Sequence, residues 1–244
     1  MKNPYRVLGI TLAVPGALLA PLFYFLLSSV PLAATALSAI ILGVTCIALA
    51  NARPYISPEA SQTLLKTGME NTAALLEELG LQNTAIYLPS HLRDGHPQAL
   101  VPLSKDGGLR NMREKLPGRL IVRYGPDNAD VAIAVTTAGS VNLELLSRKP
   151  GPTVEDIESA LNYLLTGVMD IASGVTVHLA DSTITVNVAG AKLTYENTWY
   201  NRCLGSPLAS VAAAVASEAL ARPVRIIEEV SSHGKTRISL ELLS

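Results

Sequence analysis

A continuous run of uncharged residues constrains this chain most. Residues 7–50 contain no Asp, Glu, Lys, Arg or His. One crossing of a bilayer takes about 20 apolar residues, and the apolar part of a signal peptide takes about 7–15. The run is too long for either, and it suits two crossings with a tight turn at residues 28–31, sequence SSVP. We therefore expect membrane-spanning helices over 7–27 and 32–50.

The two predicted helices differ in how they would pack. The first contains Pro15 and Pro21, which membrane helices tolerate when neighbouring helices or local adjustments satisfy the freed carbonyl groups. We expect this helix to be bent. In the second, Thr35, Ala39 and Gly43 recur every four residues, and small side chains let helices approach closely in lipid. This stripe fits packing within the hairpin, or packing against another copy or another membrane subunit.

Positive charges flank the pair of predicted helices. Lys2 and Arg6 precede the first helix, Arg53 follows the second, and the turn between them has no charge. The positive-inside rule then places both ends on the cytoplasmic side and the turn outside. The sequence predicts a multi-pass cell-membrane protein with its N-terminus and C-terminal domain in the cytoplasm and the lipid bilayer as a partner.

The charge balance and cysteine content exclude other classes. The formal net charge is −1, with 19 basic and 20 acidic residues, and no basic stripe is present to neutralise phosphates. Nucleic acid is therefore not an expected partner. The two cysteines, Cys46 and Cys203, lie one in the apolar run and one beyond it. They do not form a disulfide framework, so we expect reduced thiols.

The rest of the chain alternates helical and strand patterns. We expect three parts: a transmembrane hairpin over 1–55, a juxtamembrane helix over 56–82 and a cytoplasmic α+β domain over 83–244. The domain order of strands, helix, hairpin, helix and hairpin favours an antiparallel sheet, starting as a meander, with helices packed on it. The predicted elements of this domain are strands at 84–89, 98–103, 118–125 and 130–136, a short helix at 141–148, a helix at 153–172, a hairpin at 174–190, a helix at 207–221 and a final hairpin at 223–244.

Three stretches carry a resemblance to a known family. The pattern "LEELGLQNTAIYLPSHL", then "ALVPL", then "GSPLASVAAAVASEALARPVRI" resembles a family of uncharacterised archaeal membrane-anchored proteins. Members combine two membrane helices with a soluble domain and have no assigned activity. The resemblance therefore implies the architecture above and no particular reaction.

The last ~95 residues also resemble the vinyl-reductase-type small-molecule-binding domain. In that domain a Gly-Cys-Pro segment opens a helix of small residues, and the matching segment here is Gly205, Ser206 and Pro207. Serine in place of cysteine argues against a cysteine-based metal or redox role. The resemblance implies a pocket for an apolar ligand beside the Ala-rich helix, with Ala212 and Ala216 as wall residues.

The sequence contains no catalytic signature. Walker A, G-x-G-x-x-G, G-x-S-x-G and H-E-x-x-H motifs do not occur in it. His91 and His96 lie five residues apart without clustered carboxylates or cysteines, so we predict neither a metal site nor a cofactor. Cys203 precedes a helix start, where a thiol pKa can fall, and we retain it as a weak pocket residue only. We therefore predict a non-enzymatic protein without catalytic residues.

One polar and aromatic stretch precedes the Ala-rich helix. It contains Trp199, Tyr200 and Arg202, and aromatic residues with arginine are enriched at recognition surfaces. These residues are candidates for binding a partner, or for tucking an aromatic ring into the core. The sequence favours an accessory or scaffold protein that assembles with itself or with other membrane-complex subunits. The alternative is a sensor or carrier of an apolar small molecule.

Overall fold

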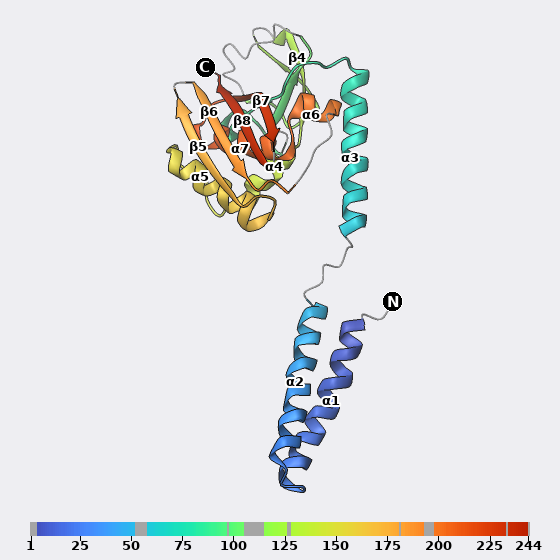
Figure 1. The fold of residues 1–244 in the computed structure, drawn as a ribbon. Coiled ribbons are helices and arrows are strands. Elements are labelled where there is room, and N and C mark those ends of the chain that lie inside the picture. Colours follow the sequence, from blue (N-terminus) through green and yellow to red (C-terminus); the bar gives the residue numbers. More distant parts are fainter. Residues whose placement is uncertain are drawn as a thin grey trace. The chain divides into compact units, whose positions relative to one another are not determined.

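The computed structural model describes residues 4–51, 58–96, 98–104, 115–125, 128–180, 182–192, 198–232 and 234–243. The chain divides into two compact units, residues 1–65 and 66–244. The first contains the predicted hairpin and the second contains the predicted α+β domain (Figure 1). Lys2 and Arg53, which carry two of the three orienting charges, lie outside the described residues.

Helices α1 (Pro4–Phe25) and α2 (Val30–Asn51) form the hairpin, close to the predicted bounds. Helix α1 continues through both Pro15 and Pro21. The two helices meet at their small residues: a Cβ atom on Gly16 would lie 2.9 Å from the carbonyl oxygen of Ala36, and one on Gly43 would lie 2.6 Å from the backbone nitrogen of Ala13. Only residues without a side chain permit this approach, as in close membrane-helix packing.

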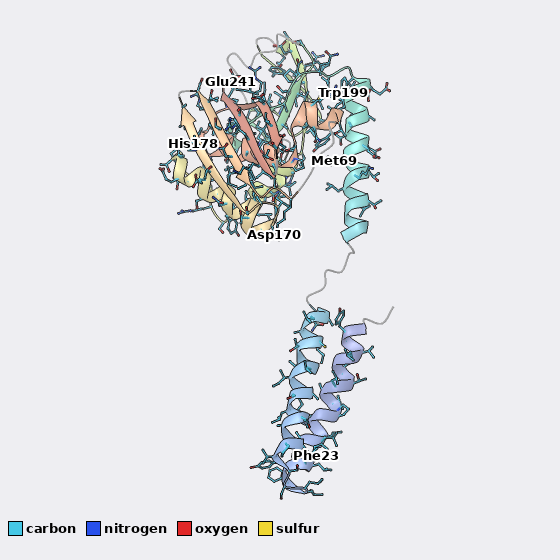
Figure 2. All side chains as sticks on the ribbon, viewed as in Figure 1. Phe23, Met69, Asp170, His178, Trp199 and Glu241 are labelled. Carbon is cyan, nitrogen blue, oxygen red and sulfur yellow. The ribbon has the colours of Figure 1, made fainter. Side chains whose placement is uncertain are left out.

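Most large side chains of the hairpin point away from its interface, whereas Ile40 and Ile47 lie in it. Leu18, Phe25 and Ile41 are among the most exposed, at 69%, 75% and 67%, and Figure 2 shows the side chains around both helices. The predicted stripe splits: Gly43 is buried against α1, Ala39 is half-buried and Thr35 is exposed, with its hydroxyl donating to Leu32 O. The seam instead follows the coiled-coil spacing Ala36, Ile40, Gly43, Ile47 and Ala50.

Three helical segments in the described part of the chain are long and apolar enough to cross a membrane. Two of them are α1 and α2. The third, Trp199–Leu220, is 89% buried inside the domain, so its apolar composition serves the protein core. The hairpin therefore carries the apolar surface that a membrane association requires.

Helix α3 (Pro58–Glu78) follows, and Gly80, with φ +66°, ends it by donating its N–H to Glu77 O. A positive φ at the residue after a helix is the conformation that glycine adopts most easily. Leu76 and Leu81 are completely buried or nearly so, whereas Leu64 and Leu65 are more than 60% exposed. The C-terminal end of α3 thus belongs to the core of the domain.

The domain is built on one antiparallel sheet in the order β3-β4-β2-β1-β7-β8-β6-β5. Its first part is no simple meander, since β4 lies between β2 and β3. The pairing of β1 with β7 joins this part to the two later hairpins. The strands are β1 (Ile86–Tyr87), β2 (Ala99–Pro102), β3 (Ile121–Tyr124), β4 (Asp130–Val135), β5 (Gly174–Ala180), β6 (Thr183–Ala189), β7 (Val224–Ser232) and β8 (Lys235–Leu242).

Helices cover one face of the sheet. Helix α7 contacts β7, β1 and β8 on one side and α4 and α5 on the other, so it lies between two layers. In Figure 1 strands β5, β6, β8 and β7 stand in front, with α5 and α4 beyond them. The helical segments are η1 (Ser90–Leu92), α4 (Ala138–Asn142), η3 (Leu143–Leu145), α5 (Val154–Asn162), η4 (Tyr163–Val168, a π-helix), α6 (Trp199–Leu204) and α7 (Pro207–Leu220).

The small residues of α7 are explained by this position. Twelve of its residues, from Leu208 to Ala219, are buried. A Cβ on Gly139 of α4 would overlap Ser210 O and lie 2.8 Å from Ala214 Cβ, so the two helices touch through their backbones. As predicted, Ser206 caps α7, accepting from Ala209 N at 3.2 Å, with Pro207 at the first position.

Candidate functional site

A cavity of about 360 Å³ lies where α4, η3 and the segment after it meet the end of α7 and the residues after η1. We call it the Arg93 pocket. It is lined by charged residues of both signs together with hydroxyl and apolar side chains. These are Arg93, Ser140, Leu143, Glu144, Leu146, Ser147, Arg148, Lys149, Pro150 and Glu218.

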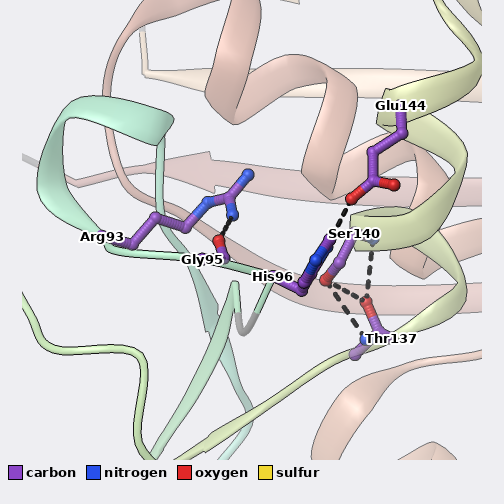
Figure 3. A network of polar contacts seen from close by, with 6 residues as sticks. All are labelled: Arg93, Gly95, His96, Thr137, Ser140 and Glu144. Carbon is purple, nitrogen blue, oxygen red and sulfur yellow. Dashed lines mark hydrogen bonds and ion pairs between the residues drawn. The ribbon is translucent and has the colours of Figure 1, made fainter.

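Backbone hydrogen bonds to Leu116 hold the segment that contains Arg93 in place. It follows η1 and adopts an extended conformation, forming an isolated parallel bridge with Leu116. On either side of it, Leu116 N donates to Leu92 O at 2.9 Å and Asp94 N donates to Leu116 O at 2.8 Å. The guanidinium Nη1 then donates to Gly95 O (Figure 3). The segment around Arg93 is thus fixed by hydrogen bonds to a chain segment more than twenty residues away.

Glu218 forms the end of the pocket on α7 and is the only charged residue of that helix. Its carboxylate accepts from Ser90 N at 2.8 Å and from Ser90 Oγ at 2.6 Å, and it pairs with Lys149 Nζ at 2.8 Å. Burial by itself raises the pKa of Glu218, but the hydrogen bonds from Lys149 and Ser90 outweigh it and leave the pKa below its ordinary value. Glu218 is therefore a fully engaged carboxylate that ties α7 to η1.

The second carboxylate of the pocket is also paired. Glu144 Oε1 contacts Nδ1 of His96 (Figure 3), and both side chains are more than half exposed. Beside this pair, Thr137 N donates to Ser140 Oγ at 3.1 Å, and the Thr137 and Ser140 hydroxyl oxygens lie 3.2 Å apart. These contacts form the reciprocal cap at the start of α4.

Arg93 has a weaker set of partners than either carboxylate. Its Nε is buried and has no hydrogen-bond partner, and no carboxylate of the described residues lies within ion-pair distance of it. Burial lowers the pKa of Arg93, and the nearby charges of Glu218 and Glu144 offset part of that shift. Arginine side chains are not deprotonated in proteins, so this guanidinium is a cation.

A metal is not what this donor set favours. Both carboxylates already accept hydrogen bonds from cations or histidine, and the described residues contain no cluster of three or more His, Cys, Asp and Glu side chains able to hold a metal ion. The free donors instead belong to Arg93, Arg148 and the hydroxyl groups. Guanidinium groups bind oxyanions, often through two parallel hydrogen bonds.

A second concave surface, of about 920 Å³, lies on the sheet. Its side chains are mixed in charge, with Glu228, Lys235 and Arg237 among them, and Arg237 donates to Asn187 at 3.4 Å. His178 on β5, opposite Thr185, and Glu241 on β8, opposite Arg225, are labelled in Figure 2 and do not line this surface. The described part of this surface holds no buried unpaired group, which makes it a weaker candidate than the Arg93 pocket.

The structure places the predicted pocket residues in the core. Ala212 and Ala216 are completely buried between the sheet and the outer helices, and they line neither the Arg93 pocket nor the concave surface on the sheet. Cys203 is 2% exposed and its thiol contacts Leu81 O at 3.4 Å. Burial raises the pKa of this thiol, and the charge of Arg202 lowers it by a smaller amount. Whether these residues bind a ligand stays a prediction.

The predicted partner-binding residues, Trp199, Tyr200 and Arg202, all lie on a short helix, α6, which no sequence pattern predicted. Trp199 donates its indole N–H to Leu81 O at 2.9 Å, and Arg202 lies over the Trp199 ring at 5.9 Å. Burial raises the pKa of Tyr200. The indole of Trp199, labelled in Figure 2, thus fastens α6 to the segment that follows α3, while Arg202 is exposed.

Sequence reasoning missed Arg93, Lys149 and Glu218 as members of one site. They come from three segments spread over 126 residue positions, and only the fold brings them together. The sequence offered one signal: Glu218 is a single charge in an otherwise uncharged helix. The contact between His96 and Glu144 is visible only in the structure.

The comparisons with known proteins identify a family without an activity. No curated protein and no solved structure matches the chain. One family model, described as a domain of unknown function (DUF7982), matches residues 2–241. The match spans the helical hairpin, the Arg93 pocket and the sheet except the last residue of β8, and the chain therefore belongs to the DUF7982 family.

Proposed function

We propose that this chain is a membrane-anchored, non-enzymatic accessory or scaffold protein, a subunit of a homo-oligomer or of a larger membrane complex. The observation that supports this most is the inverted packing of α1 and α2. Glycine and alanine, with Ile40 and Ile47, form the interface, while most of the leucine side chains and Phe25 face outward. In water each exposed apolar Å² would cost about 25 cal/mol, a cost that lipid removes.

The proposed topology puts both ends of the hairpin and the α+β domain in the cytoplasm. It is supported by the positive charges at Lys2, Arg6 and Arg53 and by the uncharged turn. The resemblance to archaeal membrane-anchored proteins with two membrane helices fits the same arrangement. In this topology the domain works at the inner surface of the membrane, where partner subunits are within reach.

Assembly is tested by measuring the mass of the extracted protein. We expect extraction from native membranes in a mild detergent, followed by light scattering, to give a protein mass well above the 25.7 kDa of one chain. Membrane proteins that co-purify with the chain in every preparation would also support assembly into a complex. A homogeneous monomer that carries no other protein contradicts the proposal. A harsh detergent, which separates subunits, provides the control.

Topology is tested with single introduced cysteines. Leu27 in the turn and Thr176 on β5 are both exposed, so Leu27→Cys and Thr176→Cys present accessible thiols. A membrane-impermeant maleimide should label Leu27→Cys in intact cells and Thr176→Cys only after the membrane is opened. The reverse pattern overturns the orientation. The unsubstituted chain is the control, because Cys203 is buried and Cys46 lies within α2.

A further inference from the structure

We infer that the Arg93 pocket binds a phosphate monoester group, carried by a soluble small molecule or by the headgroup of a lipid. This goes beyond the proposed function, because it gives the domain a ligand as well as an anchor. The inference rests on the contacts of Arg93, on the pairing of the charges around it and on the size of the cavity.

The first step is the unmatched guanidinium. Arg93 is half-buried, its Nε is buried without a hydrogen-bond partner, and its described hydrogen bond goes to a neutral acceptor, Gly95 O. A buried polar N–H without a partner costs about 1–3 kcal/mol, and more when the group is charged. The Nε atom itself is closed to the cavity, so an oxyanion there would meet Arg93 through the rest of its guanidinium and would supply a negative charge beside it.

The second step is the charge balance of the lining. Of the two carboxylates, Glu218 is paired with Lys149 and Glu144 with His96. Arg93 and Arg148 then remain as cations without an ion-pair partner in the described residues. With histidine counted as neutral, the three cations of the lining, Arg93, Arg148 and Lys149, exceed its two carboxylates by one. A phosphate monoester has three acceptor oxygens and carries about −1.5 to −2 at pH 7, so it accepts from more of these donors than a carboxylate does.

The third observation is the size of the cavity and the uncharged side chains that line it. The cavity of about 360 Å³ lies near the lower end of the range for small-molecule sites, about 300–1,000 Å³. Ser147 lines it beside Arg148, and Leu143 and Leu146 provide apolar wall. A phosphate on a short organic group would place its oxygens against the arginines and its carbon atoms against the leucines.

The test measures binding of inorganic phosphate to the full chain in detergent by isothermal titration calorimetry. We expect saturable binding of phosphate and much weaker binding of acetate, a singly charged oxyanion. Arg93→Gln should lower the phosphate affinity about tenfold or more, since it removes a charge-assisted hydrogen bond. Arg148→Gln should lower it about two- to fivefold, because Arg148 is exposed. Arg123→Gln, at an exposed position on β3, is the matched control and should leave it unchanged.

Each result decides the inference. A lower phosphate affinity in Arg93→Gln and Arg148→Gln, with the affinity unchanged in Arg123→Gln, supports it. Absence of saturable phosphate binding in the unsubstituted chain overturns it, and so does an equal loss in all three variants, which would mean non-specific charge attraction. If Arg93→Gln unfolds, as judged by the fluorescence of the single tryptophan, Trp199, the exposed Arg148→Gln variant still decides the outcome.

Bilayers of two compositions distinguish a lipid headgroup from a soluble molecule as the source of the phosphate group. The full chain is placed in nanodiscs of phosphatidylcholine, with or without phosphatidic acid, and titrated again with inorganic phosphate. A lower apparent phosphate affinity in the presence of phosphatidic acid, absent in Arg93→Gln, identifies a lipid headgroup as the occupant. Equal affinities in the two bilayers identify a soluble phosphate monoester. Loss of the proposed anchoring would appear separately, as failure of the chain to enter nanodiscs.

Discussion

Asn162, at the end of α5, pairs with the backbone of Val175 as a neighbouring strand would. Its Nδ2 donates to Val175 O at 2.9 Å, and its Oδ1 accepts from Val175 N at 2.9 Å. Two residues along, Val177 N donates to Glu158 of the same helix, also at 2.9 Å. Strand β5 is an edge of the sheet, so these side chains occupy backbone groups that could otherwise recruit another chain.

Replacing Asn162 by Ala should therefore have two effects. It leaves the N–H and the carbonyl of Val175 without partners, so we expect the domain to lose about 1–3 kcal/mol of unfolding free energy. It also opens the β5 edge, so we expect concentration-dependent self-association. Thermal unfolding followed by Trp199 fluorescence and light scattering measure the two. Thr176→Ala on the exposed face of β5 should change neither; unchanged stability in Asn162→Ala contradicts the edge-capping role.

Enlarging Ala212 distinguishes a packed core from a ligand pocket. Ala212 is completely buried, so Ala212→Leu should overpack the core around α7 and cost about 1–3 kcal/mol. If the domain is instead a carrier of an apolar molecule, as the vinyl-reductase-type resemblance implies, the added side chain would enter the cavity at little cost and displace the ligand. Thermal unfolding and native mass spectrometry of protein from its own host separate these outcomes.

Two glycines, one at the contact between α4 and α7 and one on an open face of α3, should respond in opposite ways to substitution by alanine. Gly139→Ala should destabilise the domain by several kcal/mol, about 3 or more, because the new Cβ would overlap Ser210 O and α4 would have to move. Gly68→Ala in α3 meets no atom within 4 Å and should stabilise the helix by about 0.5–1 kcal/mol. Equal effects of the two substitutions in thermal unfolding would be inconsistent with the close packing.

In the hairpin, Gly43 sets the distance between α1 and α2. A leucine at this position would collide with Ala13, whose Cβ lies 2.8 Å from where the new Cβ would stand. We expect Gly43→Leu to widen the separation of spin labels placed on Leu8 and Leu49, measured in liposomes by electron–electron double resonance. Val44→Leu, at an exposed neighbouring position, should leave the separation unchanged. An unchanged separation in Gly43→Leu rejects the glycine-based interface.

Glu218 predicts an acid-side loss of stability. Its pKa is below the ordinary value in the folded state, so its contribution is fully present above the carboxyl pKa of the unfolded chain, about 4.3, and is lost as the pH falls through the folded pKa. Glu218→Gln should be less stable than the unsubstituted chain at pH 7, and the difference should shrink below about pH 4. A gap in melting temperature that stays constant with pH would show that the ion pair with Lys149 contributes nothing.

Much of the fold could be predicted from local patterns. The uncharged run gave both helices of the hairpin within a few residues, and the cap at Ser206 with Pro207 placed the start of α7. The two later hairpins followed from alternating residues and turn chemistry. Helix α6 was missed because it is only six residues long and is held by the contact of Trp199 with Leu81 O, a partner 118 residues away.

The sequence by itself determined what each segment does locally: which residues avoid water over a length that spans a bilayer, where helices begin and where strands turn. Only the tertiary structure decided the insertion of β4 between β2 and β3, the joining of the two parts through β1 and β7, and the position of α7 between two layers. It also decided the Arg93 pocket. Arg93, Lys149 and Glu218 share no local pattern, because their proximity is set by packing between segments far apart in the chain.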